Sequence, residues 1–329
     1  MCTALFIYDL HPALLLLLTF NRDEFWERPT EPAHFWADAP ALLAGRDSLR
    51  FGTWLGLTRG GRFALLTNYR EPMSAAEPGK FVQTTTAPSR GALTTDFLTS
   101  ATPPLAYLQS LPAASYFGFN LLVGDLATRE VAYVSNRDPR GPRALPPGCY
   151  GVSNGLLQEW PKVRKGLASL LSVLGLPADQ QEQQPQQQPQ QESQQQPQEP
   201  QQQELPWAEL FGGVMGDATK VAEGEALPLT GVGEELDRRL SSIFVEPFEM
   251  QPGVRYGTRS QTVIAVWRDG RVEQRERYVE RGGSNDDGGG WVWREARHAF
   301  DMAAPGPPEA EPGGDRAWQR AFSARAGSF

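Results

Sequence analysis

The chain has 329 residues, a net charge of −8, nine tryptophans and only two cysteines. This length allows one large domain or two ordinary ones, and the negative charge argues against a general nucleic-acid-binding protein, which would present a basic surface. Two isolated cysteines build no disulfide framework and indicate a reducing compartment, so we expect a soluble, cytoplasmic protein.

Alternating apolar runs separated by turn residues predict antiparallel hairpins in the first half of the chain. The expected strands are Thr3–Tyr8 with Ala13–Phe20, Gly52–Thr58 with Arg62–Asn68, Phe117–Gly124 with Arg129–Asn136, and the single strand Cys149–Asn154. The apolar run Leu14–Leu18 has no basic residue before it and is too short to span a bilayer. We therefore expect a buried strand there, with neither a cleaved presequence nor a transmembrane segment.

Helical patterns follow the second hairpin and the strand at Cys149. Gly91–Ser100 and Pro103–Leu111 are expected to be helices, and the clearest pattern begins at Pro161, which suits a first helical position, and stops at Gly175. From Gln180 to Gln203 the chain holds sixteen Gln and four Pro but no apolar residue. Such a segment cannot compensate for the entropy lost on ordering, so residues 178–206 are predicted to be a disordered insertion.

The last part of the chain returns to a folded pattern. Glu234–Glu246 predicts an amphipathic helix, the turn Asp269-Gly270 predicts a hairpin, and Gly290–Phe300 predicts a final strand. The tail 303–329, rich in Pro, Gly and Ala, is expected to be mobile. Hairpins interrupted by a few helices indicate a single α+β domain over residues 1–302, with one or two antiparallel sheets.

Several motifs place polar residues where a buried strand is expected to stop, the position at which a sheet presents groups to a ligand. They are FNRDE from Phe20, LLTNYRE from Leu65, GFNLL from Gly118, YGVSN from Tyr150 and YGTRSQT from Tyr256. An Asn at such a position more often closes a turn through its own backbone, and an adjacent Arg and Asp can be a purely structural ion pair. These readings remain open beside the functional one.

Cys2 is the candidate nucleophile of these motifs. If Met1 is removed, Cys2 carries its own base, because an α-amine has a pKa of about 7.7, close to the ~8.5 of a thiol. Oxyanion stabilisation would need amide donors, for which Asn68, Asn120 and Asn154 are candidates. Arg22 and Arg259 are candidate cations, and Asp23 is a candidate partner of the amine. Cys149 is expected to be a small buried residue.

Ten segments taken in order resemble the NRDE family, the family of the transport and Golgi organization protein 2. They include MCT, FNRDEFWERPT, GTWLGLTRGGRFALLTNYRE, GFNLLVGD, PPGCYGVSNGLL and YGTRSQTV, and they extend from Met1 to about Lys165 and from about Glu234 to Glu280. The resemblance implies the αββα four-layer sandwich of two antiparallel sheets found in N-terminal nucleophile hydrolases. By motif it also implies a site made of Cys2, Arg22, Asp23, Asn68, Asn154 and Arg259.

One spacing in this implied site differs from the hydrolase pattern, because Arg22 and Asp23 are adjacent. Neighbours on a strand point to opposite faces. Both side chains therefore reach Cys2 only if the strand ends or bulges there; otherwise Glu24, on the Arg22 side, takes the acidic role.

Two functions follow from the resemblance and the residues. The first is a carrier or chaperone for a small apolar or acyl ligand, with haem as one candidate, in intracellular trafficking, Golgi organisation, secretion and mitochondrial metabolism. The second is a Cys2-dependent hydrolase of a linear amide or acyl thioester. The carrier requires no cofactor, and haem would be cargo, with His11, His34 or Cys2 as possible axial ligands. An interaction scaffold is a third, less specific possibility, and the sequence leaves the oligomeric state open.

Overall fold

The computed structural model describes residues 2–70, 88–177, 204–225, 227, 233–282 and 290–303. Met1, residues 178–203 of the predicted insertion and residues 304–329 of the predicted tail lie outside the described part. Glu204 to Pro206, at the end of the predicted insertion, are described, and Leu205 among them is buried.

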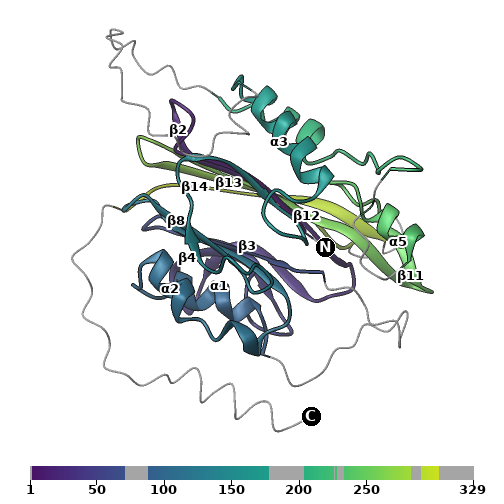
Figure 1. Cartoon of the computed structure of the whole chain (residues 1–329), viewed down its shortest axis with the longest axis horizontal. Coiled ribbons are helices and arrows are strands. Elements are labelled where there is room, and N and C mark those ends of the chain that lie inside the picture. The colour runs from purple at the N-terminus through teal and green to yellow at the C-terminus, as the bar shows by residue number, and fades with distance from the viewer. Residues whose placement is uncertain are drawn as a thin grey trace.

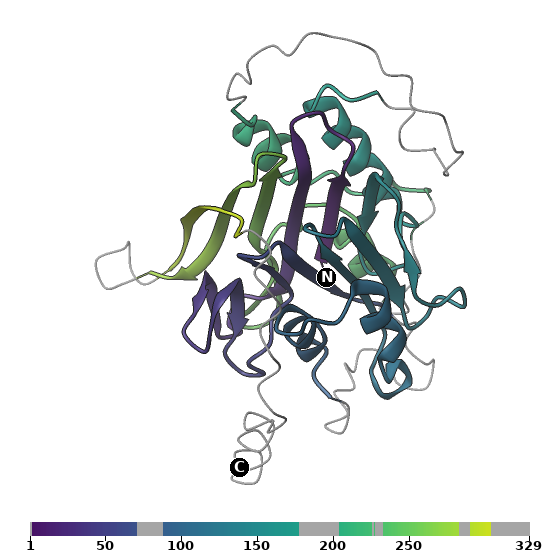
Figure 2. The same cartoon turned by 90° about the vertical axis from the view of Figure 1, so that its left-hand side faces the viewer.

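The first sheet has seven antiparallel strands in the order β10-β1-β2-β12-β13-β14, with β11 also pairing with β12. Its strands are β1 (Cys2–Tyr8), β2 (Leu14–Phe25), β10 (Gly148–Val152), β11 (Phe248–Gln251), β12 (Val254–Trp267), β13 (Arg271–Arg281) and β14 (Trp291–Asp301). The first hairpin lies in the middle of this sheet, beside strands from the C-terminal part of the chain (Figure 2). Residues far apart in the sequence are thereby brought to one surface.

The second sheet also has seven antiparallel strands, in the order β3-β4-β5-β6-β7-β8-β9. They are β3 (Thr30–Trp36), β4 (Ala39–Asp47), β5 (Leu55–Thr58), β6 (Arg62–Asn68), β7 (Phe119–Asp125), β8 (Glu130–Ser135) and β9 (Arg143–Ala144). Every neighbouring pair is also consecutive in the chain, so this sheet is a continuous meander.

Helices cover the outer face of each sheet, and three apolar clusters hold the four layers together (Figure 1). The central cluster joins the inner faces of the two sheets, for example Phe6 and Phe20 with Phe63 and Tyr133. The helices are α1 (Gly91–Leu98), α2 (Pro104–Ser110), η1 (Ala113–Ser115), α3 (Pro161–Val173), α4 (Trp207–Glu209), the π-helical η3 (Leu210–Val214) and α5 (Glu234–Arg239). The predicted αββα four-layer sandwich is confirmed.

Two parts of the predicted element order differ from the structure. Strands β3 and β4 were not expected, because Pro32 and Pro40 lie within them and their buried positions do not alternate regularly. Helix α5 ends at Arg239 rather than Glu246. Beyond it the backbone bonds outside a helix: the N–H of Phe244 donates to the carbonyl of Asp217. Among helices of the described residues, none combines the length and apolarity needed to cross a membrane.

Candidate functional site

The FNRDE motif is itself part of β2, so the strand does not stop at Phe20 as expected. Strand β2 continues to Phe25, and β1 pairs with it without a register shift, so that Cys2 stands directly opposite Arg22. Directly opposed residues of an antiparallel pair share a face. For Cys2 and Arg22 this is the inner face, because Cys2 packs against the central cluster and the Arg22 guanidinium lies 3.9 Å from the centre of the Trp54 ring.

Asp23 points to the opposite face of β2, toward the helical layer. Its Oδ1 accepts a hydrogen bond from Thr258 Oγ1 at 2.7 Å, and the same Thr258 oxygen accepts from the N–H of Val245 at 2.8 Å. The bulge lies on the partner strand β12, between Thr258 and Ser260. Arg22 and Asp23 are therefore on different faces, while Glu24 accepts from the N–H of Phe25 through its own Oε1.

Asn154 is the amide that contacts Cys2. The N–H of Cys2 donates to Asn154 Oδ1 at 3.2 Å, and Asn154 Nδ2 donates to the backbone carbonyl of Asn68 at 2.6 Å. Asn68 thus contacts Asn154 through its backbone carbonyl, and Asn68 itself is exposed. Asn120 is completely buried and bonds Thr67 among others, so it holds the strands together. The structure therefore brings together Cys2, Arg22 and Asn154.

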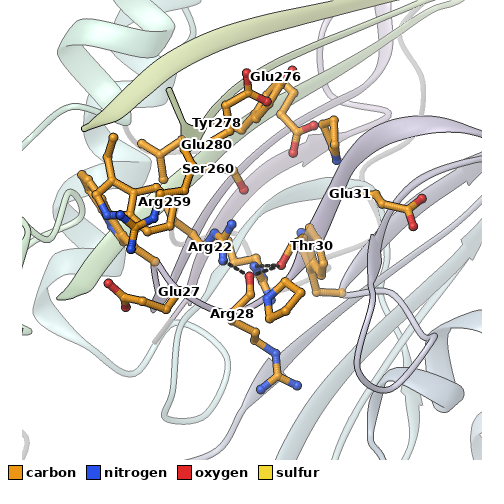
Figure 3. A pocket seen from close by; sticks show the side chains of 17 residues that line it. Arg22, Glu27, Arg28, Thr30, Glu31, Arg259, Ser260, Glu276, Tyr278 and Glu280 are labelled. Carbon is orange, nitrogen blue, oxygen red and sulfur yellow. Dashed lines mark hydrogen bonds between the residues drawn. The ribbon is translucent and has the colours of Figure 1, made fainter. Parts of the chain in front are cut away.

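Arg259 lies with Arg22 at a cavity of about 220 Å³. The bulge turns both Arg259 and Ser260 toward this cavity, while Thr258 faces the helices. Arg259 Nη1 donates to the carbonyl of Phe25 at 3.0 Å. It also donates to the carbonyl of Arg28 at 2.6 Å (Figure 3). Arg22 and Arg259 are only 5% and 6% exposed. Two nearly buried guanidinium groups are thus held at one hollow.

The walls of the cavity combine aromatic rings with charged groups. Trp26, Trp54 and Trp291 line it, and Trp26 meets Trp291 edge-on with ring centres 5.6 Å apart. Glu276 also lines it, and its Oε2 accepts from the N–H of Ala33 at 2.6 Å. Cys2 is not among the lining residues, whereas Arg22, directly opposite it on β2, is one of them. The arrangement can neutralise and stack against an anion with an apolar body.

Burial dominates the protonation behaviour of the site. It raises the pKa of the Cys2 thiol despite the opposing effect of Arg22, and it raises the pKa of Asp23 despite the hydrogen bond from Thr258. It lowers the pKa of Arg22, and that of Arg259 to about 10. A thiol whose pKa is raised is a weak nucleophile at neutral pH.

Lys162 lies behind the site, on the helical side of the first sheet. Its Nζ donates to the carbonyls of Leu240 at 3.1 Å and Ser242 at 3.0 Å, and burial lowers its pKa to about 8, opposed by Asp23 and Cys2. The family resemblance assigned no role to this lysine. In the sequence, Lys162 looks like any lysine of an amphipathic helix, and nothing distinguishes it from the neighbouring charged residues.

Sequence reasoning also missed Trp26, Ser260 and Glu276 as cavity residues. Trp26 lies within the segment FNRDEFWERPT and Ser260 within YGTRSQT, so membership of these motifs was the available signal. Glu276 is one of several charged residues in β13 and carries no signal of its own.

Neither histidine named as a possible haem ligand is itself a lining residue of the cavity. His11 Nδ1 accepts from the N–H of Ala13 at 3.1 Å, and His34 lies 3.3 Å from a Glu31 oxygen. Within the described residues, no group of three or more His, Cys, Asp and Glu side chains could hold a metal ion.

Comparison with known proteins extends the resemblance over most of the chain. Residues 1–281 match the family Transport and Golgi organisation 2. The chain belongs to this family. The human "Transport and Golgi organization protein 2 homolog" is 32% identical over 293 residues, which cover 84% of this chain and 92% of the human protein. The Drosophila melanogaster "Transport and Golgi organization protein 2" is 30% identical over 186 residues, which cover 50% of this chain and 62% of that protein.

Similar chains among solved structures include the C2A mutant of the conjugated bile acid hydrolase from Clostridium perfringens, with 12% sequence identity, a TM-score of 0.39 and coverage of 92% of both chains.

Proposed function

We infer that the protein is a carrier for an apolar organic anion, either an acyl lipid or haem, in intracellular trafficking. The observation that supports this most directly is the cavity at which two buried guanidinium groups, Arg22 and Arg259, stand beside three tryptophan rings. A buried cation is costly unless an anion accompanies it. The names of the relatives connect the family with transport and Golgi organisation, and we propose that this chain serves the same processes, with cytoplasmic, Golgi or mitochondrial association.

The size and lining of the cavity favour an acyl ligand over haem. Sites for complete drug-sized ligands measure roughly 300–1,000 Å³, so about 220 Å³ accommodates the charged end of a ligand while its body lies outside. Haem needs an axial ligand of the His, Cys, Met or Tyr type. Tyr278 is the one such residue among the lining side chains, whereas an acyl anion requires none.

Titration of the full chain with octanoate and with haem tests the proposal. Because three tryptophans line the cavity, octanoate should change the intrinsic fluorescence, and haem should give a Soret shift if it binds. Arg22→Gln should weaken octanoate binding roughly ten- to hundred-fold, the value of a hydrogen bond to a charged group. The matched control is Arg143→Gln, whose guanidinium stacks on Tyr133 in the second sheet. No response to either ligand at millimolar concentration would refute the carrier function.

A second candidate function, a Cys2-dependent amidase or acyl hydrolase, is supported by one observation. Cys2, Arg22 and Asn154 are in contact or directly opposed, as such a site requires. Intact mass would establish whether Met1 is removed, and labelling with a thiol reagent across pH would locate the Cys2 titration. Cys149, whose pKa burial raises to about 12, is an internal control. Retained Met1, or Cys2 labelling only above pH 8, would exclude the hydrolase and leave the carrier.

A further inference from the structure

Two buried hydrogen-bond donors at the cavity have no acceptor within the described residues. They are the Ser260 hydroxyl and the Trp26 indole N–H, which belong to residues only 4% and 6% exposed. A buried donor without an acceptor costs free energy, and such groups are uncommon in folded proteins unless a ligand or ion completes them. Both residues line the same hollow as Arg22 and Arg259.

The local structure explains why both donors are fixed at this place. The bulge of β12 makes Arg259 and Ser260 successive residues of the cavity wall, although neighbours on a regular strand would face opposite sides. Trp26 follows the last residue of β2 and is held edge-on against Trp291. The close-up shows the Ser260 and Arg22 side chains at the same hollow, between β12 and the segment from Glu27 to Glu31 (Figure 3).

The charged side chains that line the cavity determine how much negative charge a ligand accepting these two hydrogen bonds can carry. Four arginines and four glutamates line it. One arginine, Arg28, is already paired with Asp47 at 2.7 Å, and burial raises the pKa of Glu276, which favours its neutral form. Glu27, Glu31 and Glu280 offset part of the positive charge of the remaining arginines, so the cavity accommodates a single negative charge more readily than the several charges of a phosphate ester.

We propose that this cavity binds one carboxylate, which accepts hydrogen bonds from Ser260 Oγ and Trp26 Nε1 while Arg22 and Arg259 neutralise it. The inference rests on the proposed carrier function and narrows its ligand class. The cargo is a free carboxylic acid in its ionised form, with its apolar body outside the cavity, and not an ester or a phosphate. A carboxylate supplies acceptor oxygens to both donors, and an ester lacks the charge that the guanidinium groups require.

The test compares octanoate with methyl octanoate on the full chain by intrinsic fluorescence, with inorganic phosphate as competitor. We expect octanoate to bind at least ten-fold tighter than its ester, and phosphate not to displace it. Ser260→Ala and Trp26→Phe should each weaken octanoate binding roughly ten- to hundred-fold and leave binding of the ester unchanged.

Thermal unfolding of the same variants separates a ligand role from a structural one. Ser260→Ala removes an unsatisfied hydroxyl, so its melting temperature should equal or exceed that of the wild type. Trp26→Phe should cost less stability than the control Trp36→Phe, because the Trp36 Nε1 donates to the Ala44 carbonyl at 3.0 Å.

Each outcome of the binding test has a distinct meaning. Equal binding of acid and ester, displacement by phosphate, or unchanged octanoate affinity in both variants would overturn the carboxylate assignment while the carrier function stands. Binding of neither acid nor ester would overturn both.

Discussion

Replacing Lys162 with methionine tests the electrostatics of the buried layer behind Cys2. The ammonium group is 5% exposed and donates to the carbonyls of Leu240 and Ser242. Methionine has a similar length and no charge, so it fills the space but leaves both carbonyls without this donor. That loss costs roughly 1–3 kcal/mol per unsatisfied group, and it is independent of pH.

The charge itself makes the second contribution, which depends on pH. The folded-state pKa of Lys162 is about 8, against an ordinary value of 10.5. Each unit of difference corresponds to about 1.36 kcal/mol, so holding the ammonium charged in the fold costs roughly 3 kcal/mol at pH 7. The unfolded chain binds more protons than the folded chain between these two pKa values. The free energy of unfolding therefore rises with pH across this window by about the same amount.

Denaturant unfolding at pH 7, 8, 9 and 10 measures both contributions. The difference in unfolding free energy between wild type and Lys162→Met should grow in favour of the wild type from about pH 8 upward, because titration of all other groups is common to both proteins. The control Lys165→Met removes a half-exposed lysine of the same helix, paired with Asp217, and should show no comparable growth. A difference that stays constant from pH 7 to 10 would refute the assigned pKa and the burial argument behind it.

Three further substitutions test the fold around the site. Burial raises the pKa of Glu276, so this carboxyl stabilises the fold most at low pH, and the contribution is lost as pH rises through its folded-state pKa. Glu276→Gln should therefore flatten the pH dependence of the unfolding free energy in this range. Asn120→Ala should cost on the order of 3 kcal/mol in denaturant unfolding, because several buried partners lose their hydrogen bonds. A Cβ at Gly124 would lie 2.2 Å from Phe63, whereas one at Gly212 meets nothing within 4 Å. Gly124→Ala should thus lower the melting temperature clearly and Gly212→Ala should not.

The sequence predicted best those elements whose boundaries are determined by residues next to them in the chain. The turn at Asp269-Gly270 predicts the hairpin of β12 and β13, and Pro161 and Gly175 bracket α3 closely. Strands β3 and β4 were hidden because prolines interrupt them and their pairing contains register shifts. Their existence depends on the inner face of the opposite sheet, which no local window contains.

The same holds for the site: some of its residues could be predicted from nearby sequence, and others depend on how distant strands pair. Pairing of the first two strands sets Cys2 opposite Arg22, and the motifs named both residues. The cavity, however, forms only where β2, β12 and β13 meet, and a bulge on β12 decides that Arg259 and Ser260 share its wall. Alternation along a single strand predicts the opposite arrangement. Glu276 consequently could not be assigned to the cavity before the strands were placed side by side.

The pH titration of bound octanoate, labelled with ¹³C at its carboxyl carbon, tests the central claim most directly. If the carboxylate lies between Arg22 and Arg259, the guanidinium groups favour its charged form, and the bound carboxyl should stay ionised to a lower pH than the free acid. Arg259→Gln should move this titration back toward the free value. A bound carboxyl that titrates at or above the free acid in the wild type would contradict the account, because the guanidinium groups would then not be stabilising its charged form.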